Sequence, residues 1–352
     1  MWGMKTDRDL VGVDIGTSSV KAVQLRKKGR EIELVSAGLA DLSPDAIVDG
    51  AIMDTLSVSA AISKVFHDNH ISTRRVATSV SGSAVMVKRI GVTAASQEEL
   101  AEAVPAEARR QLSSDPAELN LDYQLLGPGS SPNVLDVMLV AARREKVSAY
   151  TGVLSQAGKK PQLIDIDGFA VQNAFETGYQ PPPDSTLALL NVGASQMNVN
   201  IVSNGVPVFA RDIPFGGMQY TEALQKALEV SFEEAEKLKR GEEHPKVTAE
   251  ARDAVLASVT QNLVAEIRGT FNFFRQMTGS AAIDRIYLSG GTARLAGLAE
   301  RVEQELAIPV EILDPLRGIA ANPANFEADK LARLSPQLAV AVGLALRSFD
   351  RA

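Results

Sequence analysis

The feature that most constrains the fold of this chain is a strand, a polar turn and a second strand near its start. The apolar run Leu10–Val13 leads into the turn Asp14–Ser19, and apolar and polar residues then alternate over Val20–Leu25. Backbone N–H groups of a glycine- and hydroxyl-containing turn can form a concave anion site, and Gly16 has no Cβ to keep an oxyanion from the backbone. The turn is therefore a candidate phosphate loop, although an ordinary hairpin has the same pattern.

The same pattern returns in the second half of the sequence. The apolar stretch Leu187–Asn191 is followed by the small polar turn Gly193–Gln196 and by the alternating stretch Met197–Val202. The two patterns lie about 177 residues apart, as counted from Asp14 to Asn191. Two similar halves that both open on such a hairpin predict a duplicated α/β fold with a cleft between the halves.

Charged side chains lie beside these turns and at the end of another predicted strand. Asp14 ends the first strand and can hold a metal ion through water, while Lys21 can neutralise phosphate charge. Asp167 ends a short predicted strand of the first half. Glu236 and Lys239 lie one turn apart on a predicted helix, where a solvated ion pair is the simpler explanation.

Glycine pairs precede two predicted helices of the second half. The strand Ile283–Leu288 leads into Gly290, Gly291 and Thr292, after which a helix is predicted. A helix N-terminus can receive anionic ligand atoms, and the glycines allow a flat ring or a ribose to lie against the backbone. A βα turn that binds nothing is the alternative. The other pair, Gly216–Gly217, also precedes a predicted helix.

Composition excludes several classes of protein. A chain of 352 residues is long enough for two or more domains, and the net charge of −7 argues against a general nucleic-acid binder. The sequence has no cysteine, which excludes disulfides and thiolate chemistry. Met1–Lys5 does not begin a signal peptide, and no run reaches the roughly 18 apolar residues of a membrane span. We therefore expect a cytoplasmic protein without direct membrane insertion.

The predicted elements also indicate how the chain divides into domains. Pro181–Pro183 is the clearest linker, because three prolines cannot continue a helix. Residues 84–161 have the pattern of strand, helix, strand, strand and helix, which predicts a small inserted α+β unit. We expect three parts: a first core subdomain of residues 1–83, 162–180 and 335–352, the inserted unit of residues 84–161, and a second half of residues 184–334.

Taken in order, these motifs resemble those of the actin-like ATPase superfamily, which includes actin, sugar kinases, heat-shock protein 70 chaperones and the bacterial division protein FtsA. The motifs are D-I-G-T-S-S-V-K, Asp167 at a strand end, N-V-G-A-S, A-E-K-L-K and L-S-G-G-T-A-R-L-A-G-L. The resemblance implies an actin-like, ribonuclease H-like duplicated fold of two domains, with ATP and Mg²⁺ in the cleft. It also implies that residues 84–161 correspond to the inserted α+β subdomain of FtsA.

The resemblance assigns a role to each matching residue. It implies that Asp14 and Asp167 are the catalytic carboxylates, and that Asp14 also holds Mg²⁺ through water. The implied nucleotide-binding residues are Gly16, Thr17, Ser18 and Lys21 in the first loop, Gly193, Ala194 and Ser195 in the second, Gly216 and Gly217, the nucleoside pair Glu236 and Lys239, and Gly290, Gly291 and Thr292 in the adenosine motif.

One residue departs from the superfamily pattern. Asn191 stands where many actin-like ATPases have an aspartate. An amide neither accepts a proton nor holds Mg²⁺ as a carboxylate does. We therefore expect ATP binding with weak hydrolysis at most, the nucleotide acting mainly as a ligand that closes the cleft.

Within the superfamily, the chain resembles the PilM family of type IV pilus assembly proteins. The residues that carry this resemblance are G-V-D-I-G-T-S-S-V-K-A-V-Q-L, V-K-R-I, L-D-Y-Q-L-L-G, D-V-M-L-V-A-A-R-R-E-K-V and I-P-F-G-G. The resemblance implies a cytoplasmic ATP-binding scaffold or adaptor, held at the inner membrane through its partners. The implied partners are the cytoplasmic N-terminal peptide of PilN, docked between the first core subdomain and the inserted unit, the assembly ATPases, and further copies of the chain in a ring. Two alternatives stay open: an FtsA-like filament protein that binds membrane itself, and a small-molecule kinase of the same superfamily.

Overall fold

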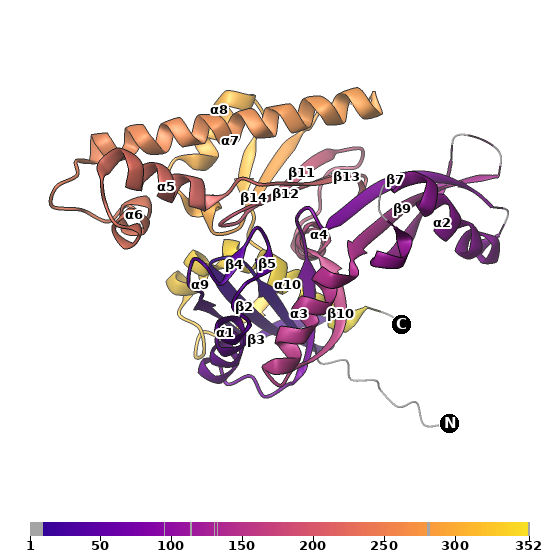
Figure 1. Cartoon of the computed structure of the whole chain (residues 1–352), viewed down its shortest axis with the longest axis horizontal. Coiled ribbons are helices and arrows are strands. Elements are labelled where there is room, and N and C mark those ends of the chain that lie inside the picture. Colours follow the sequence, from indigo (N-terminus) through magenta and orange to yellow (C-terminus); the bar gives the residue numbers. More distant parts are fainter. Residues whose placement is uncertain are drawn as a thin grey trace.

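The computed structural model of this chain describes residues 10–94, 96–112, 115–129, 131, 133–279 and 282–350. The expectation for Met1–Lys5 therefore lies outside the described residues. Two large mixed sheets, a smaller sheet to one side and a long helix over the second large sheet form the main framework (Figure 1). Each large sheet contains one of the two predicted hairpins.

The first large sheet is built around the N-terminal hairpin. In order across the sheet, its strands are β10 (Lys160–Ile166), β6 (Arg75–Val80), β1 (Val11–Ile15), β2 (Ser19–Lys28), β3 (Glu31–Asp41) and β16 (Ile319–Ala321). Strands β1, β2 and β3 form an antiparallel meander, and β6 and β10 run parallel to β1. The hairpin register places Asp14 directly opposite Lys21.

The second large sheet repeats this arrangement. In order across the sheet, its strands are β13 (Val206–Ile213), β12 (Met197–Ser203), β11 (Thr186–Val192), β14 (Arg285–Ser289) and β15 (Val310–Ile312). Again three strands form an antiparallel meander, and the next two run parallel to the first of them. The order β13-β12-β11-β14-β15 therefore matches β3-β2-β1-β6-β10, which confirms the predicted duplication.

Helices α4 (Asp167–Gly178) and α10 (Ala339–Leu346) lie between the two sheets and share one core with both. Helix α10 has apolar residues on all sides, and every one of its residues is buried. The backbone of α10 approaches those of β1 and α4 so closely that two positions must be glycine. A Cβ added to Gly12 would lie 2.0 Å from the carbonyl oxygen of Ala341, and one added to Gly343 would lie 1.7 Å from that of Ala170.

Other helices cover the outer faces of the two sheets. Helices α1 (Thr55–Asp68) and α3 (Arg144–Gln156) bury apolar side chains against the first sheet. Helices α7 (Ala249–Thr278) and α8 (Leu298–Leu306) do the same on the second sheet, and α5 (Gly217–Leu228) and α6 (Phe232–Lys239) lie at one end of α7 (Figure 1). The remaining elements include the hairpin β4 (Ile47–Val48) and β5 (Ala51–Ile52), and α9 (Ala328–Leu334).

The inserted unit is a three-stranded antiparallel sheet with one helix, and it has a core of its own. Its strands are ordered β7 (Val85–Thr93), β9 (Val134–Arg143) and β8 (Leu119–Pro128). Helix α2 (Gln97–Gln111) packs Leu100 and Val104 against this sheet. Helix α2 begins at the N-cap Ser96, whose side chain accepts a hydrogen bond from the backbone of Glu99, and it continues through Pro105.

Two of the expected domain boundaries differ from the structure. Strand β16 pairs with β3 of the first sheet, so the second half does not extend to residue 334 as expected. Helix α3 was expected within the inserted unit of residues 84–161. It instead buries Val153 and Leu154 in the core that the first sheet forms with α1. Both differences arise from contacts between distant parts of the chain, which local patterns do not specify. The other expected boundaries stay predictions.

The close approach of α10 to α4 generates a stability prediction. We expect Gly343→Ala to destabilise the protein by about 2 kcal/mol or more, because the new methyl group overlaps backbone atoms that cannot move aside. Urea unfolding of the two proteins measures the difference. The matched control is Gly152→Ala in α3, where an added Cβ meets nothing within 4 Å, and there we expect a gain of about 0.5 kcal/mol. Similar unfolding midpoints for the two variants would contradict the prediction.

Candidate functional site

The carboxyl ends of β1, β6 and β10 meet at one edge of the first sheet, where the first candidate loop lies. Asp14 is only 8% exposed, and its Oδ2 lies 3.1 Å from Lys21 Nζ. The N–H of Gly16 donates to the Ser19 carbonyl at 3.1 Å and closes the turn. Ser18 is exposed at the tip of the loop. A buried carboxylate, a lysine and an exposed serine therefore lie on one hairpin.

The second candidate loop is joined by hydrogen bonds to both predicted glycine motifs. The carbonyl of Gly193 accepts hydrogen bonds from the N–H of Gly217 at 2.9 Å and from Thr292 Oγ1 at 2.8 Å. A Cβ on Gly216 would lie 2.6 Å from the carbonyl oxygens of Gly193 and Ala194, so only glycine fits there. Three predicted segments that are distant in the sequence thus form one backbone framework.

The two candidate loops touch each other where the two halves meet. Thr17 Oγ1 and Ser195 Oγ lie 2.6 Å apart, and this hydrogen bond joins residues 178 positions apart in the sequence. Both hydroxyls are accompanied by backbone N–H groups of their own turns. The structure therefore brings the two candidate phosphate loops face to face, one from each half.

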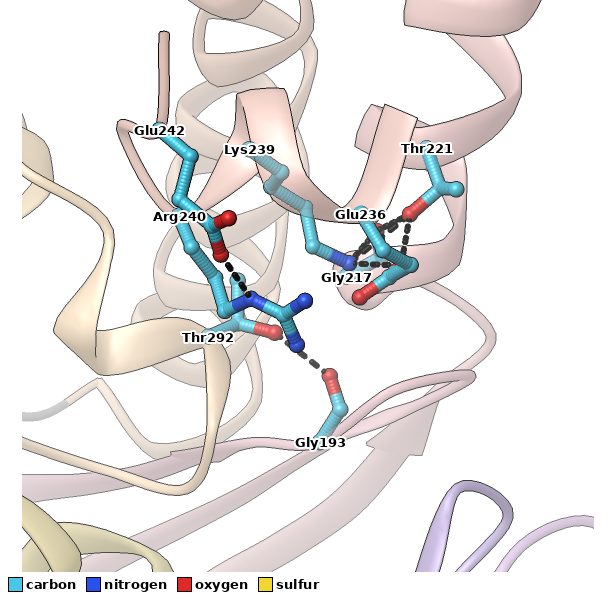
Figure 2. A network of polar contacts seen from close by, with 8 residues as sticks. All are labelled: Gly193, Gly217, Thr221, Glu236, Lys239, Arg240, Glu242 and Thr292. Carbon is cyan, nitrogen blue, oxygen red and sulfur yellow. Dashed lines mark hydrogen bonds and ion pairs between the residues drawn. The ribbon is translucent and has the colours of Figure 1, made fainter. Parts of the chain in front are cut away.

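Glu236 and Lys239 form a partly buried network rather than the solvated pair that their spacing suggested (Figure 2). The Lys239 ammonium contacts the Glu236 carboxylate and donates to Thr221 Oγ1 at 2.7 Å and to the Gly217 carbonyl at 3.2 Å. The Thr221 hydroxyl donates in turn to Glu236. Burial lowers the pKa of Lys239, and the hydrogen bond to Glu236 opposes this shift. Sequence reasoning missed Thr221, although its place one turn after Gly217 on α5 was a usable signal.

The double glycine after β14 has the backbone that its sequence predicted, but not the helix. Gly290 has a φ of +90°, and a Cβ there would lie 2.3 Å from the Val192 carbonyl oxygen. A short 3₁₀ turn, Thr292–Arg294, follows, and the α-helix α8 starts only at Leu298. Gly291 and Thr292 therefore lie on a turn against the second loop rather than at a helix N-terminus.

Asp167 is the first residue of α4 and lies at the same sheet edge as Asp14. Burial, together with the charge of Asp14, raises the pKa of the Asp167 carboxyl to about 6, while hydrogen bonds from Ser79 and Ser81 oppose the shift. Among the described residues, no three His, Asp or Glu side chains gather as a metal site. Two carboxylates whose charges oppose each other nevertheless fit a hydrated Mg²⁺, which needs only one or two protein carboxylates.

Asn191 is held by another amide rather than by a charged group. Its Nδ2 donates to Asn198 Oδ1 at 2.8 Å, and Asn198 Nδ2 donates to Asp212 Oδ1 at 2.8 Å. Burial raises the pKa of Asp212, whereas the nearby charge of Lys146 lowers it. Sequence reasoning missed Asp212 and Lys146, because no motif marks a residue that reaches this edge through the folding of distant segments.

A groove of about 620 Å³ lies between the inserted unit and the first half. Three buried polar atoms along it have no hydrogen-bond partner among the described residues: Asp165 Oδ2, Asn173 Nδ2 and Arg347 Nε. Arg347 Nε forms ion pairs with Asp165 Oδ2 at 3.6 Å and with Asp350 Oδ2 at 3.0 Å. The apolar lining includes Val80, Val140, Ile164 and Phe169.

Comparison with known proteins decides the family. The sequence family described as type IV pilus assembly protein PilM matches residues 12–349. The chain belongs to the PilM family. A solved PilM-PilN type IV pilus biogenesis complex is similar to it at 27% identity and a TM-score of 0.86, over 97% of this chain and 99% of that one. The expected membership of a pilus assembly family and the expected actin-like fold are thereby confirmed.

More distant relatives share the fold of this PilM-family chain. Cell division protein FtsA of Streptococcus pneumoniae serotype 2 (strain D39 / NCTC 7466) is 23% identical, over 93% of this chain and 80% of FtsA. Ethanolamine utilization protein EutJ from Carboxydothermus hydrogenoformans is 16% identical with a TM-score of 0.59, over 96% of this chain and 89% of that chain. In the described part of the chain, no helix has both the length and the apolar character needed to span a bilayer.

The raised pKa of Asp167 makes a prediction about pH. Since the pKa of this carboxyl rises from 3.8 to about 6 on folding, the unfolded chain releases the proton first, and stability falls as pH rises from about 4 to about 6. We expect the free energy of unfolding of Asp167→Asn to gain about 3 kcal/mol relative to that of the wild type over this range. Thermal unfolding of both proteins at pH 4 and pH 7.5 tests this, and a difference in stability that does not change with pH would contradict it.

Proposed function

We propose that this PilM-family protein is an ATP-binding scaffold of type IV pilus assembly that holds the N-terminal cytoplasmic peptide of PilN. The observation that carries the nucleotide part is the 2.6 Å contact between Thr17 and Ser195, which brings the two loops face to face. Backbone N–H groups and hydroxyls from both halves can then bind one polyphosphate between them. Lys21 adds a positive charge beside the first loop.

The nucleoside would lie against the second half. Lys239 donates to the Gly217 carbonyl, and the N–H of Gly217 donates to Gly193 of the second loop. Gly217 therefore connects the Glu236–Lys239 pair to the backbone of the second loop, which would bind phosphate. Gly290, Gly291 and Thr292 lie against the same loop.

Hydrolysis by this site would be weak. Asp14 and Asp167 can hold a hydrated Mg²⁺, which would neutralise phosphate charge and lower the pKa of Asp167. At the second loop, however, Asn191 offers an amide that is already bonded to Asn198. This position has no carboxylate to accept a proton from attacking water. The nucleotide would therefore act mainly as a ligand that sets the closure of the cleft.

The PilN part of the proposal is supported by the groove and by the similarity to a solved PilM-PilN complex over nearly the whole chain. Buried polar groups without partners destabilise a protein by about 1–3 kcal/mol each. A peptide supplies both N–H donors and carbonyl acceptors, which Asp165 and Asn173 respectively require. We further propose that this peptide holds the protein at the inner membrane, where a ring of copies connects it to the assembly ATPases.

Nucleotide binding is tested by titration calorimetry with Mg-ATP. We expect the wild type to bind and Asp14→Ala to bind at least tenfold more weakly, which corresponds to about 1.4 kcal/mol. Asp329→Ala removes an exposed carboxylate of α9 and serves as the control that keeps full affinity. Phosphate release should be slow and should rise about tenfold or more in Asn191→Asp. Rapid release by the wild type would favour an enzyme instead.

Peptide binding is tested by fluorescence anisotropy with the N-terminal peptide of PilN from the same organism. Ile164→Arg places a charge in the groove at a side chain that is 37% exposed, so the fold tolerates it while peptide affinity falls at least tenfold. The control is Leu56→Arg, an exposed apolar residue of α1 that does not line the groove. Equal affinities of the two variants would contradict the assignment of the groove.

A further inference from the structure

Two chain segments join the inserted unit to the first half, and we call them together the neck. Strand β6 ends at Val80, and Ser81–Ala84 then lead into β7; on the return path β9 ends at Arg143, where α3 begins. The N–H of Arg143 donates to the Ala84 carbonyl at 2.9 Å, so the two segments lie side by side. Any change in the orientation of the inserted unit must therefore occur at the neck.

The first contact of the neck reaches the second candidate loop. Gln196 Nε2 donates to Ser81 Oγ at 2.6 Å. Gln196 closes the second loop, because its carbonyl accepts a hydrogen bond from the N–H of Gly193 at 2.9 Å. The Ser81 hydroxyl is also bonded to Asp167, the carboxylate of the first half. One hydroxyl therefore touches polar groups from both sides of the cleft.

The second contact of the neck reaches the amide pair beneath the second loop. The N–H of Gly82 donates to Asp212 Oδ2 at 2.5 Å. Asp212 accepts a further hydrogen bond from Asn198, which accepts one from Asn191. Gly82 has a φ of +86°, a conformation that favours glycine and keeps its N–H directed at the second half. A continuous chain of hydrogen bonds thus runs from Asn191 to the neck.

Beyond the neck, the inserted unit forms a wall of the groove. It has a core cluster of its own, and its residues Val85, Val87 and Val140 pack against the core of the first half. Val80, the residue before Ser81, lines the groove together with Tyr123 and Val140 of the inserted unit. A void of about 40 Å³ between β7 and β13, lined by Val85 and Asp212 among others, leaves space for a small shift.

We infer that Ser81 and Gly82 transmit the state of the nucleotide loops to the inserted unit and so set the width of the peptide groove. The inference rests on the proposed function, since it requires a nucleotide in the cleft and a ligand groove beside the neck. A phosphate group that enters between Thr17 and Ser195 separates two atoms that are 2.6 Å apart. The displaced second loop moves Gln196, and Ser81 follows it. By linkage, peptide and nucleotide then change each other's affinity by the same factor.

Hydrogen–deuterium exchange of the full chain, with and without Mg-ATP, tests this inference. In the wild type we expect Mg-ATP to slow exchange at both loops and to change exchange in residues 119–124 of β8, of which residues 120–124 line the groove. Gln196→Leu removes the donor to Ser81 and leaves Asp14, Lys21 and Glu236 in place. We expect protection of the loops to persist in this variant, while the response of residues 119–124 falls at least threefold. Asp212→Ala, which removes the acceptor of Gly82, is a second variant with the same expected result.

The matched control is Gln162→Leu, the same chemical change at an exposed glutamine whose side chain donates to the carbonyls of Lys160 and Pro161 in its own strand. This control should respond to Mg-ATP as the wild type does. Loop protection without any response of residues 119–124 in the wild type would overturn the inference and leave nucleotide binding intact. A full response in both Gln196→Leu and Asp212→Ala would also overturn it. Absence of protection at both loops would instead overturn the proposed nucleotide binding, and this inference with it.

Discussion

The contact between the backbones of α10, β1 and α4 fixes the distance between the two halves of this molecule. Because Gly12 and Gly343 have no side chains, the two helices lie as close to the first sheet and to each other as backbone atoms allow. On the other side of α4, Phe175 and Tyr179 stack at 5.0 Å, and Phe175 lies 4.8 Å from Tyr287 of β14. The halves are thus joined by a thin, well-packed layer, and the two loops meet at 2.6 Å because that layer is thin.

The cleft above this layer combines few charges with many oriented dipoles. Asp14 and Asp167 repel each other in a partly buried position, and Lys21 compensates only Asp14 directly. On the opposite side, Asn191 and Asn198 provide neutral amides. Such an arrangement favours a ligand that brings its own cation, since the cation relieves the carboxylates while backbone N–H groups bind the anion. It is better suited to holding a nucleotide than to activating water.

The sequence allowed much of this frame to be predicted, because the decisive signals are local. The two hairpins and the double glycines at Gly216 and Gly290 are each encoded within a few residues. Their equal order in both halves specified the duplication. In the structure, the register of the first hairpin also places Asp14 opposite Lys21.

The parts that could not be predicted depend on contacts between distant segments. Strand β16 has three residues and joins the first sheet only after the whole second half has intervened. Thr221, Asp212 and Lys146 reach the cleft from elements without a recognisable motif. The groove with Asp165 and Arg347 forms where the inserted unit, β10 and the end of the chain come together, so no single stretch of sequence encodes it.

The late synthesis of β16 and α10 has a consequence for the order in which the two halves fold. The second sheet is complete once residues 186–312 have left the ribosome, because all five of its strands lie in that interval. The first sheet contains the earliest strand but must wait for β16 and α10, and Leu10 hydrogen-bonds to Ser348. We therefore expect the later-synthesised half to reach its native topology first. Until α10 is synthesised, the apolar face of β1 and β2 that it later covers stays exposed, and such a face can aggregate.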